Sequence, residues 1–251
     1  YLNYKDRTPL PVVNLFAPGV PTPFPGVAQI GNGTYSVNYF DDVHLIGATY
    51  STTLGVATVT GELSYKDNAP VLVNALLPAG QGFAEVAGVP SRGKITQLNI
   101  GTFINAGTPI ARSTQVLAEI STVYVGEIDK VQIPFNPAPA FFPYSNRRTF
   151  DTHAAIAGNL TTVLGYPGIF EGWDLTVPIS FSMQFLGRTI TGGVGGEGDM
   201  RYSLGATMVY GGNLSLGLSY LGYLGNANVT MLNFRPLTDR DQVSLVAKYS
   251  F

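Results

Sequence analysis

The last ten residues of the chain alternate regularly between apolar and polar side chains. One alternate set is Val243, Leu245, Ala247, Tyr249 and Phe251, and the other is Gln242, Ser244, Val246, Lys248 and Ser250. A period of two over a whole segment predicts a β-strand whose two faces meet different surroundings.

The clearest segment of this kind is Trp173–Leu186. Its apolar set is Trp173, Leu175, Val177, Ile179, Phe181, Met183 and Phe185, with Asp, Thr, Pro, Ser and Gln between them. Strands of soluble sandwiches rarely run this long with an uninterrupted apolar face. Such a length suits a strand that crosses a hydrocarbon layer at a tilt.

The same reasoning predicts about nine strands. They lie within Tyr35–Thr53 and at Val56–Tyr65, Lys94–Ile104, Thr114–Glu127, His153–Leu164, Trp173–Leu186, Met200–Tyr210, Leu214–Leu224 and Gln242–Phe251. Short turns are expected near Gly55, at Asn105–Ser113, at 165–172 and at 211–213, and long loops at Lys66–Gly93, Ile128–Phe150, Arg188–Asp199 and Gly225–Asp241.

This alternation of short turns with long loops is typical of bacterial outer-membrane barrels, whose short turns face the periplasm. A soluble β-sandwich, the alternative all-β architecture, has no reason to keep it. A last strand that ends on a terminal aromatic residue also fits a barrel. We therefore expect an all-β, transmembrane antiparallel β-barrel in the bacterial outer membrane.

Composition agrees with this expectation. Charged residues make up 12% of the 251 residues, about half the share of a soluble domain. Hydrophobic residues reach 45% and mean hydropathy is +0.18, without an apolar run long enough for a membrane-spanning helix. The absence of Cys fits an exported protein. The net charge of −2 argues against a nucleic-acid partner.

The first 33 residues are rich in Pro and Gly and show no periodicity, so we expect an irregular loop there. This divides the chain into an extracellular loop segment, residues 1–34, and the C-terminal part of a barrel, residues 35–251. The sequence lacks an initiator Met and a signal peptide, so Tyr1 is expected to be a processed or truncated end.

Four stretches carry a family resemblance: YSTTLGVATVTGELSYKDNAPVLVN, GWDLTVPISFS, NLSLGLSYLGYLG and DRDQVSLVAKYSF. Between Tyr35 and Phe251 the chain resembles the C-terminal half of a proteobacterial outer-membrane family, the domain of unknown function thirteen-oh-two. The resemblance implies a barrel considerably longer than this chain, a role in handling hydrophobic compounds, and inner-membrane efflux-type partners. It implies no catalytic residues.

Candidate chemistry is sparse. His44 and His153 are the two histidines, and His153 falls in an inward register that suits a polar lumen better than a Ser–His hydrolase. Metal ligands at suitable spacing are lacking, and we expect no cofactor and no enzymatic activity. The Asp239–Asp241 triplet is expected to be solvated or mutually paired rather than a Ca²⁺ site. The glycine-rich segment 192–199 lacks the Lys of a phosphate-binding loop.

Several charged residues fall in or beside strands on the face opposite the apolar set. They are Glu62, Glu119, Glu127, Arg201 and Lys248, to which His153 is added as a lumen residue. A charge facing lipid is costly, so these side chains are expected to meet water or polar groups. Two interpretations stay open: a pore lining or salt-bridge network, and simple tolerance of polar residues in a wet lumen.

The long loops are unexpectedly apolar. Candidate contacts for a hydrophobic ligand are Leu72, Val73, Leu76, Leu77, Phe83, Phe135, Phe141 and Phe142. The loops either form a ligand platform or bury their own apolar groups as a plug or against lipopolysaccharide. The first case predicts a porin-like channel or transport component for hydrophobic small molecules or lipids. The alternative is a structural barrel that docks a periplasmic or inner-membrane partner and conducts nothing.

Nine strands would leave two unpaired edges in lipid, whereas single-chain barrels have even strand numbers. We therefore expect this chain to be the C-terminal part of a larger barrel, completed by N-terminal strands. Direct hydrogen bonding between the edges near His44–Thr53 and Val243–Phe251 would contradict this expectation.

Overall fold

The computed structural model describes residues 1–6, 10–14, 34–79, 82–133, 140–142, 144–148, 153–188, 195–228 and 235–251. In parts of these ranges, including residues 75–79, 82–89 and 140–142, it describes the backbone alone. The described residues contain strands, turns and irregular connections but no helix. Accordingly, no described helix has the length and apolarity needed to cross a membrane.

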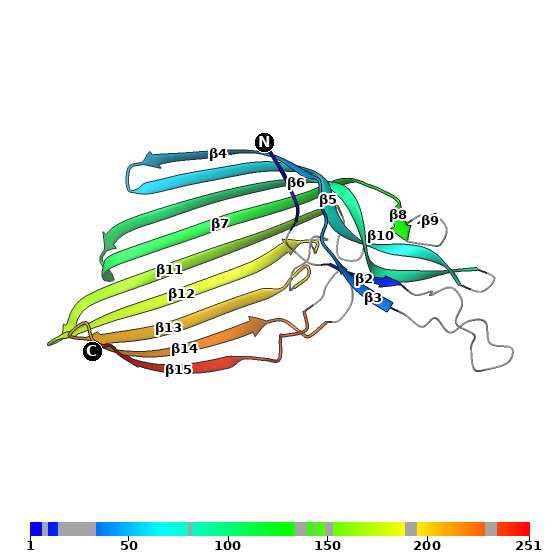
Figure 1. Cartoon of the computed structure of the whole chain (residues 1–251). Coiled ribbons are helices and arrows are strands. Elements are labelled where there is room, and N and C mark those ends of the chain that lie inside the picture. The colour runs from blue at the N-terminus through cyan, green and yellow to red at the C-terminus, as the bar shows by residue number, and fades with distance from the viewer. Residues whose placement is uncertain are drawn as a thin grey trace.

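One antiparallel sheet dominates the fold (Figure 1). Its strands follow one another in the order β1 (Leu2–Tyr4), β4 (Val43–Leu54), β5 (Ala57–Ala79), β6 (Gly82–Thr108), β7 (Ala111–Ile128), β11 (Ala154–Phe170), β12 (Trp173–Leu186), β13 (Met200–Tyr210), β14 (Leu214–Leu224) and β15 (Gln242–Tyr249). Off this path, β10 (Tyr144–Arg148) pairs with β5. Two small sheets join β2 (Leu10–Asn14) to β3 (Thr34–Asn38) and β8 (Val131–Ile133) to β9 (Ala140–Phe142).

The nine strands predicted from the sequence are confirmed as β4 to β7 and β11 to β15, and each pairs with the next of these nine. The main sheet is open: β15 forms one edge, and β4, with the short β1, forms the other. In the described residues these two edges do not pair with each other (Figure 1).

The register confirms the predicted alternation across neighbouring strands. Leu218 lies between Ala206 of β13 and Leu245 of β15, so apolar residues share one face. Ser219 lies between Gly205 and Ser244 on the other. We call these the apolar face and the polar face. The apolar face is uncovered in the monomer, with Leu218 54% and Leu245 80% exposed.

The expectation of a long loop at Lys66–Gly93 is wrong, because β5 and β6 continue as a hairpin in which Ala79 pairs with Gly82. Proline does not break this hairpin. Pro70 and Pro90 lie beyond the ends of the pairings with β4 and β7, where a strand has a free edge that tolerates a missing N–H.

Two further segments that were expected to be irregular contain short strands. Within Ile128–Phe150 the described residues form β8, β9 and β10. The N-terminal 33 residues contribute β1, which pairs with β4, and β2, which pairs with β3. Residues 15–33 lie outside the described part of the chain.

A β-bulge changes the face that residues of β5 occupy. Asn68 has φ of 62°, and the register with β6 shifts between Lys66 and Ala69. A one-residue shift moves the following side chains to the opposite face. Val71 and Val73 consequently lie on the polar face, where both are fully buried.

These valines belong to a compact group that we call the rim core, at the end of the sheet that carries the long connections. Its members are Val43, Ala69, Val71, Val73, Ile95, Val125, Ile128 and Ala155, all buried. Pairings such as Lys66–Ile95 and Ile95–Val125 place them on the polar face. The polar face is therefore polar along the middle of the strands and apolar at the rim.

The turn before β12 provides a test of local packing. Gly172 has φ of +74°, and a Cβ there would lie 2.8 Å from Cε2 of Tyr210. Gly168 also has a positive φ, of +64°, but a Cβ added to it would meet no atom within 4 Å. Gly172→Ala is expected to lower the free energy of unfolding by about 1 kcal/mol more than Gly168→Ala, because only the first also displaces a ring. Urea unfolding monitored by tyrosine fluorescence measures both, and equal losses would contradict this packing.

Candidate functional site

The polar face presents a wall of short polar side chains along the middle of the sheet. Ser180 and Ser203 share a hydrogen bond of 2.6 Å between their hydroxyls across β12 and β13. On β7 the hydroxyl of Ser121 donates to Glu119 at 3.2 Å, and on β11 that of Thr161 donates to Asn159 at 3.3 Å. The side chains of this polar wall bond one another along and across strands.

Charged residues on this wall lie where the alternation predicts. Glu62 pairs with Asn99, Glu119 with Asn159 and Lys248 with Ser215, all on the polar face. Arg201 also lies on this face, opposite Ser182. Its Nε and Nη2 donate to one oxygen of Asp199, at 2.9 and 2.6 Å. Because Asp199 is buried, this pair fixes the connection before β13 to the strand.

Glu127 and His153 differ from the expectation of an inward position. The bulge in β7 places Gly126 and Glu127 opposite Lys94, and Glu127 forms an ion pair with that lysine. Lys94 precedes Ile95, whose side chain lies on the polar face, so Lys94 points to the apolar face. The Lys94–Glu127 ion pair therefore lies on the apolar side of the sheet, at its rim end. His153 has φ of 81° and stacks on Tyr124, an apolar-face residue, at 6.3 Å between ring centroids.

Two of the candidate ligand contacts, Leu72 and Val73, have described side chains, and these lie on opposite faces of the sheet. Val73 is buried in the rim core, whereas its neighbour Leu72 points to the opposite face and is half-buried. For the others the description is limited to the backbone: Leu76, Leu77 and Phe83 lie in the β5–β6 hairpin, and Phe141 and Phe142 in β9. Phe135 lies outside the described residues.

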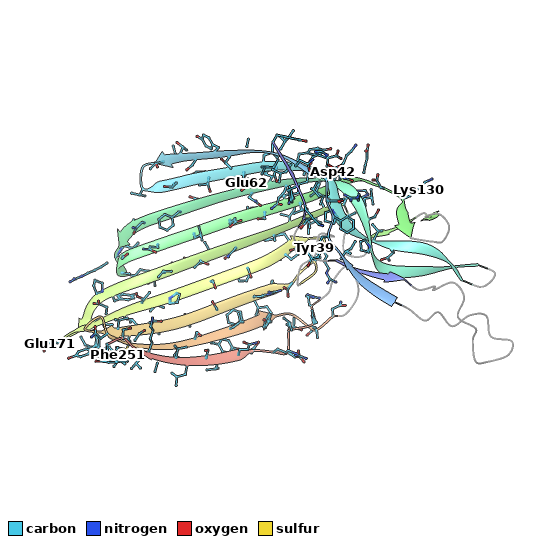
Figure 2. The ribbon with its side chains drawn as sticks, in the orientation of Figure 1. Tyr39, Asp42, Glu62, Lys130, Glu171 and Phe251 are labelled. Carbon is cyan, nitrogen blue, oxygen red and sulfur yellow. The ribbon has the colours of Figure 1, made fainter. Side chains whose placement is uncertain are left out.

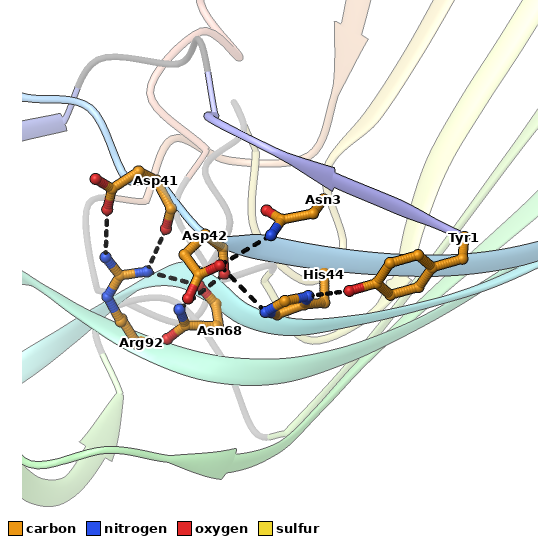
Figure 3. Close-up of polar contacts among 7 residues, drawn as sticks. All are labelled: Tyr1, Asn3, Asp41, Asp42, His44, Asn68 and Arg92. Carbon is orange, nitrogen blue, oxygen red and sulfur yellow. Dashed lines mark hydrogen bonds and ion pairs between the residues drawn. The ribbon is translucent and has the colours of Figure 1, made fainter.

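A cluster of polar contacts, which we call the rim clamp, joins β1, β4, β5 and β6 at the rim (Figure 3). Arg92 of β6 donates to the carbonyls of Asp41 at 2.8 Å and Asn68 at 3.1 Å, and forms an ion pair of 3.2 Å with the Asp41 carboxylate. Its guanidinium also lies over the ring of Phe40, 5.0 Å from the centroid.

The rest of the rim clamp is centred on Asp42, whose φ is 57°. Its carboxylate accepts a hydrogen bond of 3.0 Å from Asn3 of β1 and lies 3.3 Å from His44, and its carbonyl accepts one of 2.9 Å from Asn68. The clamp holds β1, the start of β4 and the bulge of β5 together. Sequence reasoning missed it because residues that bond each other in it are up to 51 positions apart.

Figure 2 labels residues at both ends of the sheet. Tyr39, Asp42 and Lys130 lie at the rim, and Glu171 and Phe251 lie at the short-turn end. Beside β15, Asp239 and Arg240 form an exposed pair at 4.0 Å. Hydrogen bonds from the Tyr220 hydroxyl and the Tyr223 amide lower the pKa of Asp241 below its ordinary value. Among the described residues no group of three His, Asp or Glu side chains is placed to hold a metal.

Comparison with known proteins gives one match. The family model described as "Protein of unknown function (DUF1302)" matches residues 1–251. No curated protein and no solved structure matches the chain.

The rim clamp predicts that replacing Arg92 lowers the free energy of unfolding more than replacing an arginine outside the clamp. Arg92→Ala leaves the Asp41 carboxylate without this partner and two carbonyls without their donor, so we expect a loss of about 1–3 kcal/mol in the free energy of unfolding. Arg112→Ala, at the exposed short-turn end, should change it by less than about 0.5 kcal/mol. Urea titration compares the two, and a similar small change in both would show that the clamp adds no stability.

Proposed function

Because this chain belongs to the DUF1302 family, whose function is unknown, we propose that it forms wall strands of an outer-membrane β-barrel that conducts hydrophobic small molecules or lipids. The observation that carries the proposal is the two-faced sheet, with one uncovered apolar face and one polar face over the same strands. Membrane barrels are built in this way because lipid surrounds them and water fills them.

The dimensions of the apolar band support a membrane location. Tyr202 and Tyr220 meet near the rim, 5.8 Å apart between centroids, and Trp173 and Tyr210 meet near the short turns, 5.1 Å apart. The segment from Tyr202 to Tyr210 measures about 27 Å along the strand at the usual rise per residue. A tilted transmembrane strand needs about 9–11 residues, with aromatic residues at both interfaces.

In this proposal the short turns face the periplasm, and the long connections contact lipopolysaccharide outside. β4 and β15 run in the same direction, since an even number of antiparallel steps separates them. β1 pairs antiparallel with residues 43–45 of β4. In the described structure, the rest of the outer edge of β4 can still pair with a further strand. Bare strand edges are costly in lipid, so further antiparallel strands, from this polypeptide or another, would complete the wall.

Transport would begin at the apolar segments of the rim and continue along the polar wall. Leu72, Leu76, Leu77, Phe83, Phe141 and Phe142 are the proposed first contacts for solute, and Glu62, Glu119, Arg201 and Lys248 line the wetted path. Val73 is left out because it is buried in the rim core. The role is passive passage rather than catalysis.

The rim core favours a second candidate. It packs apolar side chains against the polar face at the outer end, which would restrict a pore there. A barrel restricted in this way would dock a periplasmic or inner-membrane efflux-type partner without conducting.

The membrane location predicts opposite responses from adjacent residues of β14. Leu218→Arg places a charge on the apolar face and is expected to cost about 2–4 kcal/mol when the protein folds into phosphatidylcholine vesicles. Ser219→Arg, on the polar face, should cost less than about 1 kcal/mol. Urea titration of vesicle-folded protein gives both values. Equal tolerance of the two arginines would contradict a lipid-facing sheet.

Transport predicts that rim aromatics control apolar flux. Replacing Phe141 and Phe142 together by Ser should slow entry of the fluorescent probe N-phenylnaphthylamine into vesicles about tenfold, equivalent to roughly 1.4 kcal/mol of lost contact. Phe170→Ser, at the short-turn end, serves as the control and should leave entry unchanged. Unchanged flux in the double variant, with the barrel correctly assembled, would reject the rim contacts. Absence of both conductance and probe entry in the unmodified protein would favour the docking role.

A further inference from the structure

A groove of about 300 Å³ crosses the apolar face near the middle of the strands. Its floor is formed by small residues of three adjacent strands: Thr102 of β6, Ala118 of β7 and Gly158 of β11. Thr102 pairs with Ala118, and Ala118 pairs with Leu160. Gly158 lies two residues before Leu160 on β11 and therefore on the same face. The register therefore gathers short side chains at one place on a face that otherwise carries large ones.

Large apolar residues form the walls of this groove. Ile120 is 54% exposed and Leu160 is 47% exposed, so both stand out from the sheet beside the floor. A Cβ on Gly158 would lie 2.6 Å from Cε2 of Phe185, which shows that the phenyl ring lies directly on this glycine. The ring closes one side of the groove, and the glycine is what allows it to lie so low.

The shape and chemistry of the groove define its ligand. Its lining extends from Val59 on β5 to Phe181 on β12, across four inter-strand steps, or about 19 Å at the usual strand spacing. One leaflet of the hydrocarbon core is about 15 Å thick, so a single acyl chain has a comparable length. An α-helix, with a diameter of about 10–12 Å, is too wide to enter a trough between neighbouring side chains.

We propose that this groove binds one acyl chain of a membrane phospholipid. The walls offer dispersion contacts to a slender hydrocarbon, and the groove opens on the face that the proposed function turns toward lipid. The inference rests on that membrane placement but not on transport. A second copy of this sheet fits less well, because bulky residues such as Ile120 and Leu160 project beside the trough and would hold another sheet away from its floor.

The test fills the groove from its floor. Ala118→Phe places a ring where the acyl chain would lie, and Ala206→Phe places the same ring on the apolar face at β13, outside the groove. Both variants and the unmodified protein, in detergent, are titrated with dipalmitoyl phosphatidylethanolamine and examined by native mass spectrometry. We expect one lipid per unmodified chain, about tenfold weaker binding for Ala118→Phe, and unchanged binding for Ala206→Phe. Heat-dependent gel mobility checks folding, and Ala118→Leu replaces the first variant if it does not fold.

Other outcomes overturn the proposal. Equal lipid binding by all three proteins, or an equal loss of binding in both variants, would show that the lipid binds the apolar face without preference for the groove. Binding of N-phenylnaphthylamine that Ala118→Phe weakens, without binding of phospholipid by the unmodified protein, would make the groove a solute site. Conductance is recorded on the same samples: lipid binding without conductance contradicts transport and leaves the acyl-chain site standing.

Discussion

The structure depends on one constraint: in a continuous antiparallel sheet, the side chains of every strand alternate between the same two faces. Neighbouring strands must therefore agree in register, since a slip by one residue would bring Leu218 to the side of Ser219. The backbone hydrogen bonds of the sheet and the division between apolar and polar side chains enforce each other. Each added strand extends both faces at once.

The departures from this alternation determine how the rim is built. The bulge at Asn68 turns Val71 and Val73 toward the polar face, and the bulge at Gly126 and Glu127 turns Glu127 away from it. Both bulges lie at the same end of the sheet, where the rim core and the rim clamp replace the polar wall. A buried apolar cluster forms there because the strands run past the end of the apolar band.

The mid-sheet groove and the rim illustrate two ways of using side-chain size on a sheet. At the rim, four valines on the polar face (Val43, Val71, Val73 and Val125) are almost completely buried. At the middle of the apolar face, Thr102, Ala118 and Gly158 leave space that Phe185 and its neighbours border. The first arrangement stabilises the chain by itself, and the second leaves a surface that a hydrocarbon ligand would complete.

By itself, the sequence determined the nine main strands and the face of most residues, because side-chain alternation is local and is read from consecutive positions. It failed at Lys66–Gly93, where three prolines and many apolar residues without regular alternation conceal a hairpin. Tertiary structure alone decided the bulges, the contacts of Arg92 with Asp41 and Asn68, and the meeting of Phe185 with Gly158. These features depend on register between separate strands, and register is fixed only when the whole sheet pairs.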